Sequence, residues 1–123
     1  MNARDYQNQA HAFASYGENA MYPALGLAEE AGEVCGKIAK FIRKHYGTEP
    51  TTQVDDRVLR QEPTPDDVQF RKDLVKELGD VLWMVAELCT VYGLSIDGVM
   101  IANIAKLEDR LSRGVIVGEG DDR

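Results

Sequence analysis

The chain has 123 residues, of which 44% are hydrophobic, and this length fits one domain around one hydrophobic core. It carries 21 acidic residues against 14 lysines and arginines, and the resulting net charge of -7 argues against nucleic acid or an anionic membrane surface as the main partner. No segment reaches the roughly 18 apolar residues of a membrane span, and the N-terminal stretch lacks a signal-peptide core. Cys35 and Cys89 lie among apolar residues of helical segments, which favours buried thiols over a disulfide. We therefore predict a cytoplasmic protein that does not bind membranes.

Helical periodicity dominates the chain from its N-terminus, and the alternation typical of strands is nearly absent. The first predicted helix covers residues 3–15 and ends before Gly17. A second helix begins at Pro23, because proline is favoured at a first helical position, and runs up to Gly47. Its apolar residues recur every three or four positions and form one buried stripe: Leu27, Ala31, Val34, Ile38 and Ile42. This pattern predicts an all-α protein.

The next segment, residues 46–69, is polar and contains three prolines. It is longer than an ordinary connection, which favours a lid, a partner-binding arm or a disordered stretch. Near its end, Thr64 is a candidate N-cap for a third helix, with Pro65 at the first helical position and two aspartates in the first turn. We expect this third helix to run to about Tyr92, before Gly93.

A fourth helix is predicted to begin after Ser95, another candidate N-cap, and to run to Arg113, before Gly114. The tail that follows is short and rich in glycine, so no further helix is expected there. The four helices are predicted to form one domain over residues 1–123, into which residues 46–69 are inserted.

Two of these helices carry acidic residues at matched spacing beside their apolar stripes. On the second helix, Glu30 and Glu33 lie three residues apart, and Glu29 is one turn from Glu33. Glu77 and Asp80 repeat the spacing on the third helix. If the two helices pack antiparallel, about four carboxylates converge on one point, and hard oxygen ligands in that number suit Mg²⁺ or Mn²⁺.

Two other interpretations of these acids are solvated surface residues and a di-iron site. Solvated acids on a helix surface are common, and any single EExxE pattern is compatible with them. A di-iron site in a helical bundle needs Glu-x-x-His pairs, and neither His11 nor His45 has that spacing. The repetition on a second helix favours the magnesium or manganese site.

The EExxE pattern of Glu29, Glu30 and Glu33, followed by the ExxD pattern of Glu77 and Asp80, resembles the MazG-like all-α nucleoside triphosphate pyrophosphohydrolases. The resemblance extends from about Tyr22 to the C-terminus. It implies a four-helix-bundle-like MazG fold and Mg²⁺-dependent hydrolysis of the α-β phosphoanhydride. The products would be a nucleoside monophosphate and pyrophosphate.

In this interpretation the acids share the catalytic work. Metal ions held by Glu30, Glu33, Glu77 and Asp80 would activate water, polarise the α-phosphate and neutralise the leaving pyrophosphate. Glu29 is either a further ligand or the group that orients the water. Mn²⁺ is a possible substitute for Mg²⁺.

The candidates for substrate binding lie mainly on the fourth helix. Asn103, Lys106 and Arg110 share one side of it, and the two cations are predicted to bind phosphate, because acids alone repel a triphosphate. Alternatively, these cations only complement the negative end of the helix dipole, and Lys37, Lys40 and Arg123 are then the next candidates for phosphate contacts. Met84, one turn after the second acid of the third helix, is the candidate for the base pocket, and Arg123 in the tail is a candidate to close over the nucleotide.

The third helix also predicts self-association. Between Val81 and Ala86 its apolar side chains surround the helix, which a small monomer cannot cover. Trp83 in this run is expected to pack in the core or an interface rather than to stack on a base. The family resemblance implies a homodimer, or a homotetramer made of two dimers.

The sequence leaves the substrate open among related possibilities. A purine deoxynucleoside triphosphate such as dGTP is the first candidate. Phosphoribosyl-ATP is an alternative substrate with the same chemistry. From a different class, the chain would be a non-catalytic helical interaction module whose acids are merely solvated.

Overall fold

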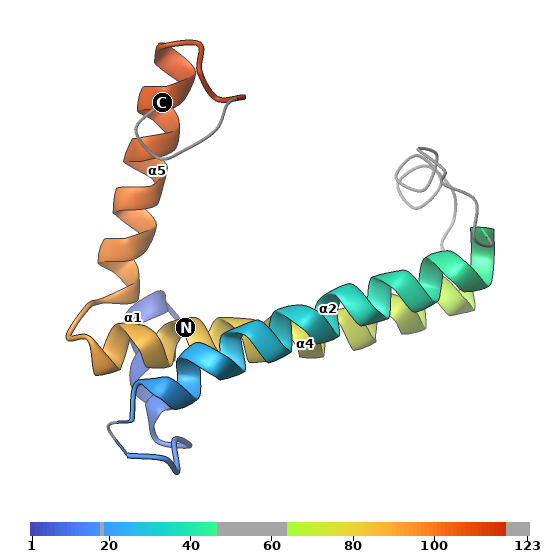
Figure 1. Ribbon diagram of the computed structural model, residues 1–123, viewed down its shortest axis with the longest axis horizontal. Coiled ribbons are helices and arrows are strands. Elements are labelled where there is room, and N and C mark those ends of the chain that lie inside the picture. Colours follow the sequence, from blue (N-terminus) through green and yellow to red (C-terminus); the bar gives the residue numbers. More distant parts are fainter. Residues whose placement is uncertain (18, 47–63, 118–123) are drawn as a thin grey trace. The chain divides into compact units, whose positions relative to one another are not determined.

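The computed structural model describes residues 1–17, 19–46 and 64–117. Within these ranges there is no strand, and the four helices are α1 (Ala3–His11), α2 (Met21–Tyr46), α4 (Pro65–Val91) and α5 (Ile96–Ser112) (Figure 1). The all-α prediction is confirmed. The chain divides into two compact units, one of Asn19–Val85 and one of Met1–Glu18 with Ala86–Arg123. The single domain stays a prediction, and residues 47–63 of the predicted insert lie outside the described residues.

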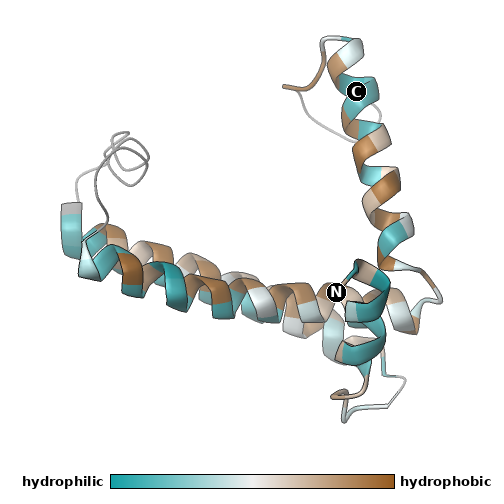
Figure 2. Cartoon of the chain, turned by 180° about the vertical axis from the view of Figure 1, so that it is seen from behind, coloured by the Kyte–Doolittle hydropathy of each residue, from teal (hydrophilic) through white to brown (hydrophobic). Residues whose placement is uncertain are grey.

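The unit of residues 19–85 is built on α2 and most of α4, which run side by side in opposite directions (Figures 1 and 2). Near the start of α2, a Cβ added to Gly26 would lie 2.6 Å from Met84 Sδ, so the absence of a side chain allows this close approach. Further along α2, the rings of Phe41 and Phe70 stack with centroids 4.1 Å apart. Residues near the start of α2 thus contact the C-terminal half of α4, and residues further along α2 contact its N-terminal half. These contacts define the register of the antiparallel pair.

Both N-caps predicted from the sequence are confirmed. At the start of α4, the Thr64 hydroxyl accepts a hydrogen bond from the Asp67 amide at 3.2 Å, and the Asp67 carboxylate accepts one from the Thr64 amide at 2.8 Å. At the start of α5, Ser95 Oγ accepts a hydrogen bond from the Gly98 amide at 3.0 Å. These bonds satisfy amide groups that a helix leaves unpaired at its N-terminus.

The second unit combines α1, the end of α4 and α5. Its hydrophobic core consists of Ala86, Cys89 and Ile96, with Ala3 and Tyr6 packed against it. Gln7 links the elements of this unit, because its amide nitrogen donates to the Leu94 carbonyl at 3.0 Å while its amide oxygen accepts from the Ile96 amide at 2.9 Å.

Helix α1 is shorter than the predicted residues 3–15. It ends at His11, and the amides of Ala12, Phe13 and Ala14 then bond to carbonyls three residues earlier instead of four. These are tightened turns of the kind that close an α-helix. No glycine or proline marks this end in the sequence, since the nearest is Gly17, which has a positive φ of 62°.

The expectation of two buried thiols is correct for one cysteine and wrong for the other. Cys89 is buried in the core of its unit, whereas Cys35 is exposed, and both are free thiols. Cys35 lies on α2, which α4 covers only on one side within the unit of residues 19–85. Among the described helices, none alone is long and apolar enough to cross a membrane, and α4 with α5 passes that test only as a bent pair.

Candidate functional site

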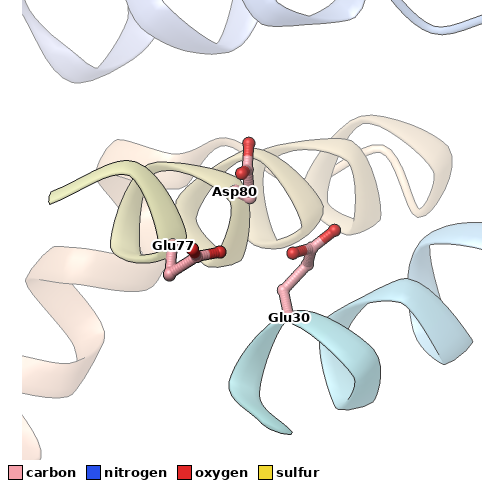
Figure 3. Close-up of side chains that lie close together, drawn as sticks. All are labelled: Glu30, Glu77 and Asp80. Atoms are coloured by element: carbon pink, nitrogen blue, oxygen red, sulfur yellow. The ribbon is translucent and has the colours of Figure 1, made fainter. Parts of the chain in front are cut away.

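Three acidic side chains meet where α2 faces α4. Glu30 comes from α2, and Glu77 and Asp80 come from successive turns of α4 (Figure 3). One carboxylate oxygen from each lies within 4.8 Å of the others. The antiparallel pairing causes this meeting, because the i, i+3 spacing places both α4 acids on one side of that helix. Three of the four predicted metal ligands are thus brought together.

The fourth predicted ligand, Glu33, lies beside these three. Its carboxyl group is hydrogen-bonded to Glu77, and this bond, reinforced by charge repulsion from Glu77, raises the pKa of Glu33 above its ordinary value. Desolvation raises the pKa of Glu30, and the negative charges of Asp80 and Glu33 raise it further. The negative charges of the neighbouring acids therefore make ionisation of Glu30 and Glu33 less favourable.

This donor set fits a hard divalent cation. Its members are carboxylate oxygens, the ligands that Mg²⁺ and Mn²⁺ prefer. Glu77 is 8% exposed, so its charge is poorly screened by water. A bound cation would relieve the repulsion that raises the pKa values of Glu30 and Glu33.

A lysine also contacts this cluster, and its contact with the acids was not predicted. Lys37 Nζ lies 3.1 Å from Glu77 Oε1, and the hydrogen bond raises the pKa of Lys37. Lys37 stands one turn after Glu33 on the same face of α2, which is a signal that the sequence contains.

Two cavities continue from the acids along α2. The first has a volume of about 410 Å³, and Glu29, Glu33, Lys37 and Lys40 are among the residues that line it. The second has a volume of about 210 Å³ and is lined by Lys37, Lys40 and Lys44 together with residues of α4. Glu29 is exposed at the first cavity, and its charge contributes to the raised pKa values of both Glu30 and Glu33.

The predicted substrate-binding residues are not all placed near these acids. Asn103 and Lys106 are exposed on α5, while Arg110 on the same helix is only 5% exposed. All three belong to the other unit, so their approach to the acids stays a prediction. Met84 is buried against Gly26 of α2, and its role in a base pocket also stays a prediction.

The last of these candidates, Arg123, lies outside the described residues. Its predicted closure over the nucleotide therefore stays a prediction.

Comparison with known proteins adds independent information. The family model described as the MazG nucleotide pyrophosphohydrolase domain matches residues 20–114. The Gene 37 protein of Mycobacterium phage L5 is 38% identical over 106 residues, which cover 86% of this chain and 78% of that protein. No solved structure matches the chain. Since the matched residues make up most of the chain and contain the whole acidic cluster, the chain belongs to the family of the MazG nucleotide pyrophosphohydrolase domain.

Proposed function

We propose that this protein is a nucleoside triphosphate pyrophosphohydrolase. It hydrolyses the α-β phosphoanhydride and releases a nucleoside monophosphate and pyrophosphate. The observation that carries this proposal is the meeting of Glu30, Glu77 and Asp80 within 4.8 Å, inside the range of the family match. We name a purine deoxynucleoside triphosphate such as dGTP as the first substrate to test.

The acids have distinct roles in this proposal. Glu30, Glu33, Glu77 and Asp80 would hold Mg²⁺, for which Mn²⁺ is a substitute. When bound, the metal supplies positive charge that activates water and stabilises the leaving pyrophosphate. Glu29, exposed at the adjoining cavity, would either complete the ligand set or orient the water by accepting a hydrogen bond from it.

The phosphates need cations in addition to the metal. We assign this role to Lys106 and Arg110, with Asn103 as a neutral hydrogen-bonding partner of the substrate and Met84 in the base pocket. Arg123 is assigned to the closure over bound nucleotide. The free thiols of Cys35 and Cys89 are compatible with the reducing cytoplasmic setting that we propose.

The first prediction is release of pyrophosphate from a panel of canonical ribonucleoside and deoxyribonucleoside triphosphates by the full chain with Mg²⁺. Pyrophosphate and the monophosphate should appear in equal amounts, and EDTA should stop the reaction. Glu77→Gln and Asp80→Asn should each lower kcat/KM about a hundredfold or more, because several kcal/mol of metal-dependent stabilisation is lost. Phosphoribosyl-ATP is added to the panel to test the related activity.

Two further variants complete this experiment. Lys106→Ala should lower kcat/KM about tenfold to a hundredfold, since one charge-assisted contact to phosphate is removed. Glu108→Gln, at an exposed acid on the same helix, is the matched control and should retain activity. A folded protein that releases no pyrophosphate from any of these substrates would favour the non-catalytic interaction module instead.

A further inference from the structure

The ammonium group of Lys37 lies where a metal ion would compete with it. It is 3.1 Å from Glu77 Oε1, and Glu77 is also the most buried of the three acids whose oxygens converge. A carboxylate that donates its lone pairs to a divalent cation keeps little attraction for a neighbouring ammonium group. The two cations also repel one another at this short range.

The side chain of Lys37 has another place to go. It lines both cavities that extend along α2, the second of them together with Lys40 and Lys44. The spacing of these three lysines places them on one face of the helix. A lysine carries its charge on a flexible four-carbon chain, and the Lys37 side chain is 37% exposed, so it can turn from Glu77 into the cavity.

The second cavity offers an anion three lysines of α2, which face Asp66 and Asp73 of α4. Lys44 is held by Asp66 at 2.6 Å, so part of the positive charge at the far end is already neutralised. Lys37 and Lys40 line the end nearer to the acids. A chain of phosphates that begins at the metal site would therefore meet Lys37 first.

We propose that Lys37 is an exchangeable counter-ion, whose ammonium group neutralises Glu77 in the metal-free protein, leaves it when a divalent cation binds, and then binds the phosphates of the substrate. This inference rests on the proposed function for its last step. It couples the two ligands, because the metal releases the lysine that the phosphates require. The opposite role, in which Lys37 holds Glu77 in place for the metal, predicts effects of the opposite sign.

The test begins with calorimetric titration of the full-length, metal-free protein with Mn²⁺. Lys37→Met removes the competing charge and keeps the length of the side chain, so it should bind Mn²⁺ about two- to fivefold more tightly than the wild type. The Mn²⁺ affinity of Lys37→Gln should lie between those of Lys37→Met and the wild type, because its amide still donates a hydrogen bond to Glu77 but carries no charge. The control is Lys76→Met. Lys76 is adjacent to Glu77 in the sequence, but its ammonium group pairs with Asp73. The Mn²⁺ affinity of this variant should therefore change less than that of Lys37→Met.

The second titration adds inorganic pyrophosphate to the same proteins saturated with Mn²⁺. Here Lys37→Met should bind roughly fivefold to tenfold more weakly than the wild type, because a charge-assisted contact is lost, whereas Lys76→Met should bind like the wild type. Circular dichroism verifies that all variants are helical. If the proposed hydrolysis fails, the wild type releases no pyrophosphate, yet the Mn²⁺ titration can still be interpreted. Equal or weaker Mn²⁺ binding by Lys37→Met, or unchanged pyrophosphate binding, would overturn the exchange.

Discussion

The carboxyl group of Glu33 shows how a single residue responds to the repulsion within the acidic cluster. Its hydrogen bond to Glu77 and the negative charge of Glu77 both raise its pKa. A proton shared between the two side chains stabilises the folded protein, and its loss leaves two neighbouring carboxylates. In the metal-free protein, the interaction between Glu33 and Glu77 therefore stabilises the fold less as the pH rises.

A prediction of pH dependence follows from the sign of this shift. Because the pKa of Glu33 is higher in the folded chain than in the unfolded chain, the folded state binds more protons between the two values, and its stability falls as pH rises through that window. Glu33→Gln removes the titration, and its amide can donate to Glu77 as the protonated acid does. In EDTA, the melting temperature of the variant should exceed that of the wild type by an amount that grows as the pH rises above the ordinary value of 4.5.

Circular dichroism melts at a series of pH values measure this difference. Glu33→Ala serves as the companion variant, because it removes the charge but supplies no donor to Glu77, and it should gain less than Glu33→Gln. A difference between Glu33→Gln and the wild type that stays constant or shrinks with rising pH would contradict the repulsion.

The acidic residues of the site could be predicted individually, but the sequence does not decide which of several basic residues contacts them. Spacing alone places Glu77 and Asp80 on one side of their helix, and Glu30 and Glu33 on one side of theirs. Helix α2, however, carries several basic residues on its C-terminal half, which look alike in the sequence. Only the facing residues of α4 decide that Lys37 is the one that contacts Glu77.

At the scale of elements, α2 and α4 come close to one another at a glycine. A Cβ at Gly26 would lie 2.6 Å from Met84 Sδ, and Met84 is only 3% exposed, so its thioether has little room to move. At Gly36, further along the same helix, an added Cβ would meet nothing within 4 Å. Gly26 and Gly36 therefore differ in what a methyl group would encounter.

This contrast predicts opposite effects of the same substitution. Gly26→Ala should lower the free energy of unfolding by about 1–3 kcal/mol, because it overpacks the contact with Met84. Gly36→Ala should raise it by roughly 0.5–1 kcal/mol, since alanine loses less backbone entropy in a helix than glycine does. Urea unfolding of the metal-free proteins measures both. Equal changes in the two variants would show that the α2–α4 distance does not depend on Gly26.

At the scale of the whole molecule, large apolar side chains remain exposed. Hydrophobic residues recur along α5 (Figure 2), and the exposed ones include Met100, Ile101, Ile104 and Leu111, of which Ile101 is 70% exposed. On α4, Leu82 is 45% exposed. It belongs to the apolar run between Val81 and Ala86 from which we predicted self-association. Exposed apolar residues at helical spacing are typical of surfaces that another chain covers. We propose that the protein is a homodimer or a homotetramer made of two dimers.

Light scattering after size exclusion tests this assembly. We expect a mass well above the 13.7 kDa of one chain. Ile101→Glu combined with Ile104→Glu should shift the mass toward the monomer, because it places charges in the buried contact. Glu108→Lys, at an exposed polar position of the same helix, is the control and should leave the mass unchanged. A wild-type monomer at micromolar concentration would refute self-association.

The sequence by itself determined the class of fold, the bounds of most helices and the two acidic patterns. Caps such as Thr64 and Ser95 act on amides two or three residues away, and a helix face is set by residues three or four positions apart. These effects are local, so they are present in the sequence whatever the rest of the chain does. The end of α1 was not determined in this way, because no glycine or proline marks His11 as its last residue.

Tertiary structure alone decided which groups meet. Glu30 and Glu77 are separated by more than forty positions along the chain, yet their oxygens lie within 4.8 Å because α2 packs antiparallel to α4 in one register. The same register buries Met84 against Gly26 and brings Lys37 to Glu77. Register depends on how two helix surfaces fit together, and periodicity within one helix carries no information about that fit.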